Sequence, residues 1–226
     1  MTEASTSATT RTGQVVPTAR AGTDTTPETA PAPPAVAVGD PSMIGLPAFL
    51  VGSVALALVD IGYAPVAAAG AAVPIIVAAT SVGLLIAAVW AARLGQNAVA
   101  SVFGVFAGFW LSFAALLLGL SHTWFAVLPA GVTRTVEVFL IAWIVVVGLL
   151  TVGTLRLPVV FTALLALVEL ALVLLLIANI NASTGLTKTA GWVIAAFAAV
   201  GAYLYLSALS TATGGRAYPL GRPLVR

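Results

Sequence analysis

The side chains that most often perform chemistry are scarce in this sequence. Its 226 residues include no cysteine and one histidine, His122, with seven acidic and nine basic residues. Without cysteine there is no disulfide, no thiolate metal site and no cysteine nucleophile, and a single histidine excludes a metal site built on several histidines. We therefore expect no metal, no cofactor and no catalytic centre, and we look for chemistry in a few carboxylates.

Glu169 is the most informative carboxylate because it lies near the middle of a long apolar run, LLALVELALVLLL. A charge in hydrocarbon costs at least ~2.5–3.5 kcal/mol, so an acid at this depth usually faces a cavity or a partner. One interpretation is an acid that carries protons or lines a pore. The other is a protonated glutamic acid that is hydrogen-bonded between two helices. The sequence leaves both open.

Two further carboxylates lie at the ends of apolar runs. Glu137 follows Arg134 by three residues, which is the spacing of an ordinary helical ion pair and favours a structural role. Asp60 ends the first apolar run, where the helix dipole disfavours an acid. It is either a proton-handling or gating residue of an outer vestibule or a solvated helix end.

The composition indicates that the elements carrying these acids lie in a membrane. Hydrophobic residues make up 61% of the chain and charged residues 7%, with a mean hydropathy of +1.13. A soluble domain is roughly 45–50% apolar and about 25% charged, so a soluble fold is excluded. The net charge of +2 comes from scattered basic residues, which excludes a nucleic-acid partner. We predict an all-α integral membrane protein.

Six apolar runs are long enough to cross a bilayer, which requires about 20 predominantly apolar residues. They form one domain, residues 41–212, between a tail of residues 1–40 and a short tail of residues 213–226. The first tail has no periodic apolar face and no apolar signal segment, so we expect it to be disordered and uncleaved. The predicted spans are residues 43–62, 68–92, 98–120, 135–155, 157–178 and 190–210.

The basic residues predict the orientation of these spans. Seven of the nine fall on the side that holds both ends of the domain, and two fall on the opposite side. Because cytoplasmic segments carry the excess of Lys and Arg, we expect both termini in the cytoplasm. The seven are Arg11, Arg20, Arg93, Arg156, Arg216, Arg222 and Arg226, and the two are Arg134 and Lys188.

The third predicted span carries an aromatic stripe. Phe106, Trp110 and Phe113 share one helical face. Packing between helices is the more common role of such a stripe, and the lining of a pore is the alternative.

Short motifs follow one another in a fixed order between residues 40 and 221. They are DPSMIGLPAF (40–49), VDIGY (59–63), GFW (108–110), GTL (153–155), the NI…AGW run (179–192) and GRAYPLG (215–221). In this order they resemble the acetate uptake transporter family, which includes the bacterial succinate–acetate permeases. Asp40, Pro41, Gly45 and Leu46 stand in the positions of the family's Asn-Pro-Ala-Pro-Leu-Gly-Leu signature. The resemblance implies a homo-hexameric plasma-membrane protein with a urea-channel-like six-helix bundle and a pore in each protomer.

The resemblance also implies a function and a site. Family members are permeases for acetate and related small carboxylates, usually described as proton-coupled, and are not enzymes. Their pore narrows at three side chains, which correspond to Phe49, Phe106 and Val168 here. The family's Tyr is replaced by Phe106 and its Leu by Val168, so this constriction is less polar than is usual in the family. These residues lie 6, 8 and 11 residues into their predicted spans, or about 9–17 Å deep at ~1.5 Å per residue, so they can meet.

Other functions stay open on the sequence. One is a channel for a small neutral solute such as urea or ammonia, and another is a membrane subunit that transports nothing. An intramembrane enzyme is the weakest alternative, because no acid–base pair stands at hydrogen-bond spacing within a span.

Overall fold

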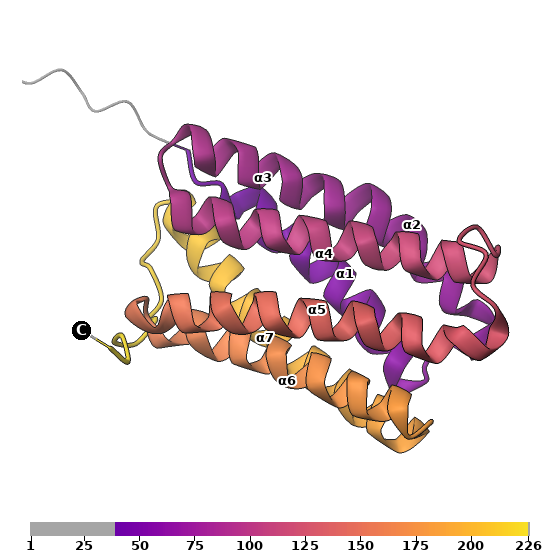
Figure 1. Ribbon diagram of the computed structural model, residues 1–226. Helices are drawn as coiled ribbons and strands as arrows, with labels where there is room; N and C mark the ends of the chain where they lie inside the picture. Colours follow the sequence, from indigo (N-terminus) through magenta and orange to yellow (C-terminus); the bar gives the residue numbers. More distant parts are fainter. Residues whose placement is uncertain (1–38, 226) are drawn as a thin grey trace, which may run out of the picture. The chain divides into compact units, whose positions relative to one another are not determined.

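The computed structural model describes residues 39–225, and these form a helical bundle that contains no strand (Figure 1). Within these residues six helical segments are long and apolar enough to cross a membrane, which confirms the predicted all-α membrane fold. The predicted tail of residues 1–40 lies outside the described residues, apart from its last two. The spans are Ser42–Ile61, Ala72–Arg93, Asn97–Ser121, Pro129–Arg156, Val159–Ile180 and Thr184–Ala212.

The helices follow the apolar runs closely. They are α1 (Ser42–Ile61), α2 (Ala72–Pro74), α3 (Val82–Arg93), α4 (Asn97–Ser121), α5 (Val132–Gly153), α6 (Val159–Ile180) and α7 (Thr184–Ala212). A π-helical segment, Ile75–Ser81, joins α2 to α3 within one span. Short 3₁₀ turns at Val66–Ala71, Pro129–Gly131 and Thr154–Arg156 precede α2, precede α5 and follow α5.

Local chemistry explains two helix ends. Gly62 ends α1 with a φ of +92°, a left-handed conformation that glycine adopts without steric strain. The Ser183 side chain accepts a hydrogen bond from the backbone N–H of Leu186 at 3.3 Å, so α7 begins at Thr184. The last span is therefore longer than the predicted residues 190–210, because a polar first turn lowered its apparent hydropathy.

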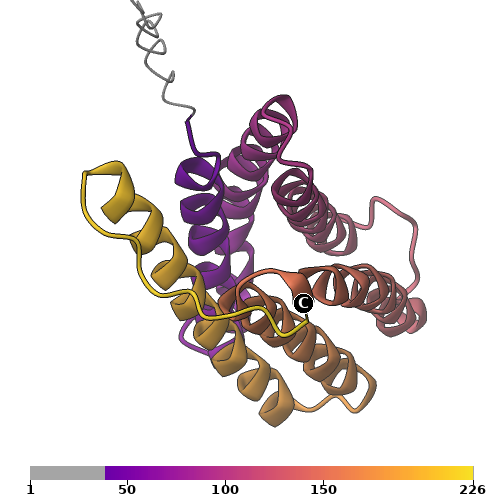
Figure 2. The same cartoon turned by 90° about the vertical axis from the view of Figure 1, so that its left-hand side faces the viewer.

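The helices form an open ring whose last seam is closed by side chains. Helix α1 packs on α3 and α7, α3 packs on α4, and α6 packs on both α5 and α7, whereas the backbones of α4 and α5 scarcely approach each other (Figures 1 and 2). Aromatic rings bridge this seam. Phe109 of α4 lies 5.4 Å from Trp143 and 5.9 Å from Phe139 of α5, and Phe113 lies 5.9 Å from Phe139, between ring centroids.

Small residues let α1 sit close to its neighbours. A Cβ atom at Gly52 would lie 2.5 Å from the Thr80 hydroxyl of the π-helical segment. A Cβ atom at Gly191 of α7 would lie 2.7 Å from the backbone nitrogen of Ile61. Close backbone approach of this kind is the usual role of small residues between membrane helices.

Candidate functional site

A cavity of about 370 Å³ lies among the ends of the helices. It is bounded where α1, α4 and α6 begin and where α5 and α7 end. Its wall is mostly hydrocarbon, from side chains that include Leu46, Val99, Val102, Leu164, Leu204 and Leu220. Its polar groups are Asp40, Ser42, Thr154, Ser207 and Thr211. Among the described residues that line this large cavity there is no Lys, Arg or His, so Asp40 is its charged group.

A second cavity of about 30 Å³ lies deeper among α1, α4, α6 and α7. Its volume is enough for about one water molecule. The side chains that line this small cavity are hydrocarbon apart from the indole of Trp110. Polar and charged groups are therefore concentrated at the large cavity, and the small cavity is dry.

Phe49 and Phe106 line both cavities and stand between them. Their rings meet edge to face with centroids 5.2 Å apart, and both side chains are buried. Val168 is buried too and lines the small cavity. The structure thus brings together the three side chains that the resemblance assigned to a constriction.

One member of this cluster was not predicted from the sequence. Phe197 of α7 is buried, lines the small cavity and lies 5.7 Å from Phe49 between ring centroids. The signal for it is its isolation, since Phe197 is the one aromatic residue between Trp192 and Tyr203 in a stretch of Ala, Val, Ile and Gly. In the aromatic stripe of α4, Phe106 and Trp110 line the small cavity, whereas Phe113 packs on α5.

The signature residues build the start of α1 and the floor of the large cavity. The Asp40 carboxylate accepts a hydrogen bond from the backbone N–H of Ser42 at 2.9 Å. Pro41 is fully buried, and Gly45 faces the ring of Phe103 so closely that a Cβ atom would overlap it. Leu46 lines the cavity, one turn below Phe49.

Residues 214–225, which we call the C-terminal strap, fold back along the helix ends (Figure 2). The strap is fastened to α7, where Tyr218 N–H donates to the Ser207 hydroxyl and the Tyr203 hydroxyl donates to the Pro219 carbonyl, each at 2.9 Å. It is fastened to the start of α6 and the loop before it as well. These bonds run from Val160 N–H to the Leu220 carbonyl at 3.3 Å, and from Leu224 and Val225 N–H to the Leu155 carbonyl at 3.1 Å. The strap therefore closes one side of the large cavity through Leu220.

The two candidate acids lie outside both cavities. Glu169 points toward α5, where its Oε1 atom is 3.6 Å from the position of a Cβ at Gly148. Asp60 is at the far end of α1 from the large cavity, beside Gly191. One carboxyl oxygen of each is buried and has no hydrogen-bond partner within residues 39–225. Within residues 39–225 Glu169 lines neither cavity, and its buried Oε2 atom has no hydrogen-bond partner.

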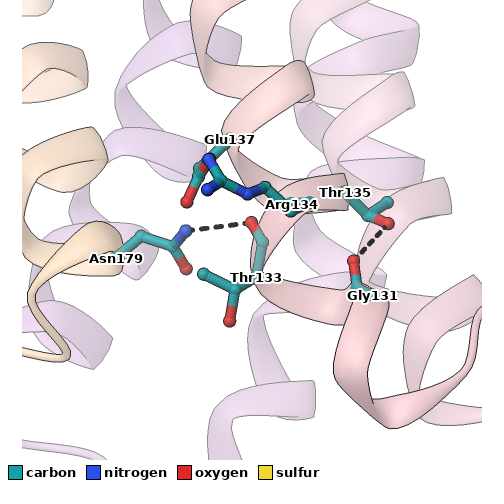
Figure 3. A network of polar contacts seen from close by, with 6 residues as sticks. All are labelled: Gly131, Thr133, Arg134, Thr135, Glu137 and Asn179. Carbon is teal, nitrogen blue, oxygen red and sulfur yellow. Dashed lines mark hydrogen bonds and ion pairs between the residues drawn. The ribbon is translucent and has the colours of Figure 1, made fainter.

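The predicted ion pair between Arg134 and Glu137 is confirmed (Figure 3). Glu137 is buried, whereas Arg134 is exposed. Beside the pair, the Asn179 side chain donates a hydrogen bond to the Thr133 carbonyl at 3.1 Å and ties the end of α6 to the start of α5 (Figure 3). This network lies at the ends of α5 and α6 that are remote from the large cavity.

Two yeast proteins resemble the chain over much of its length. Accumulation of dyads protein 2 of Saccharomyces cerevisiae is 30% identical over 210 residues, which cover 87% of this chain and 69% of that protein. Ammonia transport outward protein 2 of the same yeast is 32% identical over 123 residues. That match covers 51% of this chain and 42% of that protein, so it spans less than half of the relative.

A solved structure and a family model agree with the resemblance seen in the motifs. The structure of the bacterial acetate channel SatP superposes with a TM-score of 0.71 at 23% sequence identity, covering 81% of this chain and 99% of that chain. This match shows a shared fold. The family model described as the GPR1/FUN34/yaaH family matches residues 21–217. The chain belongs to the GPR1/FUN34/yaaH family of acetate transporters.

Proposed function

We propose that this protein is a membrane permease for acetate and related small carboxylates, with one pathway through each protomer. The observation that carries the proposal is the contact between Phe49 and Phe106, which separates a wide cavity from a narrow one. An apolar constriction of this kind admits small solutes that lose water at little cost and excludes large or strongly hydrated ones. Phe49, Phe106 and Val168 are the residues to which we assign this selection.

The relatives support a small solute of this kind. SatP is described as a bacterial acetate channel, and its fold covers most of this chain. Ammonia is the second candidate, because one relative is named an ammonia transport outward protein. A specific feature favours it: no basic side chain lines either cavity among the described residues, so an uncharged solute meets no electrostatic disadvantage there.

Proton coupling is part of the proposal, with the proton carried on the solute. A carboxylic acid has a pKa near ~4, so its anion predominates at neutral pH. Glu169 and Asp60 line neither cavity, and the acid nearest the pathway is Asp40. We infer that a proton which accompanies acetate past Phe49 travels as the hydrogen of the acid itself, and that Glu169 and Asp60 contribute through packing.

The charge distribution and the family support proposals for the orientation, the membrane and the assembly of the protein. We propose that the large cavity opens to the cytoplasm, since Arg93, Arg156, Arg216 and Arg222 lie at its end of the bundle. We also propose the plasma membrane as the location and a homo-hexamer as the assembly, as the family resemblance implies.

Reconstituted vesicles test the function. Uptake of labelled acetate and of labelled methylammonium, an ammonia analogue, is compared with that of protein-free vesicles at alkaline pH, where little acetic acid crosses the lipid unaided. We expect acetate uptake well above the protein-free level, with accumulation that a protonophore abolishes. If methylammonium is taken up and acetate is not, ammonia replaces acetate as the proposed substrate. Uptake of neither solute would contradict both candidates and leave a non-transporting subunit.

A further inference from the structure

The far part of the C-terminal strap is held against the loop between α5 and α6 (Figure 2). The backbone N–H groups of Leu224 and Val225 both donate to the Leu155 carbonyl at 3.1 Å. Gly221 has a φ of +78° and approaches the start of α6 so closely that a Cβ atom would overlap the Val159 side chain. Residues 221–225 are therefore fastened at one place on the bundle, beside the end of α5.

Hydrocarbon is exposed at this place. Leu224 is 60% exposed and Val225 is 44% exposed, although both are bonded to the loop through their backbones. The last turns of α5, directly before this loop, also expose large apolar side chains, Leu149 and Val152. The strap therefore adds exposed apolar side chains at the end of a membrane span, which is the depth where hydrocarbon gives way to lipid headgroups.

Two arginines flank the contact between the strap and the loop. Arg156 follows Leu155 directly, and Arg222 stands two residues before Leu224. Both are exposed, and neither forms an ion pair with another of residues 39–225. Basic side chains beside exposed hydrocarbon are typical of segments at a membrane surface, where the charged groups reach the headgroups and the apolar groups enter the acyl boundary.

The charge at this end of the bundle favours an anionic partner. Among the described residues, four arginines and one acid lie at the large-cavity end, an excess of three positive charges, whereas two basic and two acidic residues balance at the opposite end. The exposed hydrocarbon beside Arg156 and Arg222 favours a phospholipid over a soluble anion. The residues are Arg93, Arg156, Arg216, Arg222 and Asp40 at the first end, and Arg134, Lys188, Asp60 and Glu137 at the second.

We propose that Arg156 and Arg222 bind the phosphate group of an anionic phospholipid, with Leu224 and Val225 against its acyl chains. A guanidinium group binds phosphate through paired, charge-assisted hydrogen bonds. The lipid fastens the strap to the bundle. Because Leu220 of the same strap forms part of the wall of the large cavity, the lipid also stabilises that side of the cavity. This inference concerns the membrane, so it stands or falls separately from the identity of the transported solute.

A spin label on the strap tests its depth in the membrane. The chain has no cysteine, so Leu224→Cys gives a single labelling site and keeps the backbone bond to Leu155. Electron paramagnetic resonance compares the access of oxygen, which concentrates in lipid, with that of a water-soluble nickel chelate. In vesicles of phosphatidylcholine with added phosphatidylglycerol we expect oxygen to be the stronger relaxant. In phosphatidylcholine alone, access of the nickel chelate should rise several-fold.

Matched charge variants of the labelled protein locate the site. Arg156→Gln together with Arg222→Gln should abolish the response to phosphatidylglycerol. Either change alone should raise the phosphatidylglycerol fraction at half-effect about fivefold. Arg93→Gln together with Arg216→Gln is the control, because it removes the same charge at the same end. Arg93 ends α3 and the Arg216 carbonyl is bonded to Ser210 of α7, so both lie away from the loop before α6. This control should respond as the wild type does.

Four outcomes would overturn the proposal. A label that the nickel chelate reaches equally in every lipid mixture would place the strap in water. A label that neither reagent reaches would place it against protein, such as a second copy of the chain. Equal loss of the response in both double variants would reduce the site to a general attraction of the basic end. Recovery of the lipid-like signal in phosphatidylcholine vesicles on addition of soluble glycerol phosphate would replace the lipid by a free anion.

Discussion

The two cavities share the rings of Phe49 and Phe106 but have about 370 Å³ on one side and about 30 Å³ on the other. The large cavity lies where five helices begin or end, and its wall includes hydroxyl groups, Asp40 and the C-terminal strap. The small cavity lies between the middle turns of four helices, where bulky side chains interdigitate. The helix ends therefore surround a wide cavity with polar groups in its wall, whereas the middle turns surround a narrow cavity with an apolar wall.

Under the proposed function, the large cavity captures the solute, and the rings of Phe49 and Phe106 select between solutes. A cavity of a few hundred Å³ is in the size range of small-molecule sites and is large enough for acetate with its water. The small cavity is too small to hold a hydrated ion. Changes at the shared rings should therefore alter which solutes pass, and changes elsewhere in the large cavity should alter how fast they arrive.

The largest expected effect comes from removing a shared ring. Phe49→Ala would join the two cavities, so the uptake of lactate and succinate relative to acetate should rise by an order of magnitude. Val168→Ala should act in the same direction but less strongly. Competition uptake on correctly folded protein measures the ratios. A core Phe→Ala change loses roughly 3–5 kcal/mol of stability in soluble proteins, so folding is checked by thermal denaturation.

Phe103→Leu serves as the control for this prediction, because Phe103 lines the large cavity without reaching the small one. Its substrate ratios should match those of the wild type. Unchanged ratios in both Ala variants would mean that the pathway avoids these residues.

A smaller effect is expected from the strap. Ser207→Ala together with Tyr203→Phe removes two of its hydrogen bonds to α7, at about 1 kcal/mol each. The melting temperature should fall, and the acetate rate should change a few-fold at unchanged substrate ratios. Ser112→Ala is a matched control, since its hydroxyl bonds within α4. Altered ratios would give the strap a share in selection.

Gly201→Ala should have a still smaller effect, in the opposite sense to loss of a ring. A Cβ atom at this position of α7 would lie 3.6 Å from the Phe49 ring and 3.2 Å from a Leu50 methyl group. It would fill the space behind the Phe49 ring and restrain the ring. Acetate uptake should therefore slow about twofold, and the uptake of larger carboxylates relative to acetate should fall. Faster uptake would indicate that the ring moves away from α7 when solute passes.

The smallest effect is expected at Glu169. Because its side chain faces Gly148 and lines neither cavity, Glu169→Gln should leave acetate uptake and its pH dependence unchanged. Initial rates measured across a pH series check this. A variant that loses the pH dependence would put Glu169 on a proton pathway and break the assignment of selection to the rings.

The sequence predicted the spans well and the contacts between them less completely. Hydropathy located all six spans because each lies in hydrocarbon, and counting residues placed Phe49 and Phe106 at one depth. Phe197 was missed because an aromatic residue in an apolar helix gives no sign of the direction it faces. The direction of Glu169 depends on the packing of α5 against α6, which neither composition nor periodicity encodes.

The strap and the π-helical segment were missed for a different reason. The strap is short, and its place on the bundle depends on a bond to Ser207 of α7 and on bonds to Leu155 and Val160, which are remote in sequence. The π-helical segment Ile75–Ser81 has the same composition as the α-helices around it. The hydropathy pattern marks neither feature.

The π-helical segment has a consequence for how this span can change in evolution. A π turn holds one residue more than an α-helical turn, and it is equivalent to a one-residue insertion. Here the extra residue is accommodated between Pro74 and Val82, where the Ser81 hydroxyl bonds to the Ile76 carbonyl five residues earlier. We therefore expect homologous genes to differ by one codon at this place, with α2 and α3 keeping their orientations, because the π turn absorbs the extra residue.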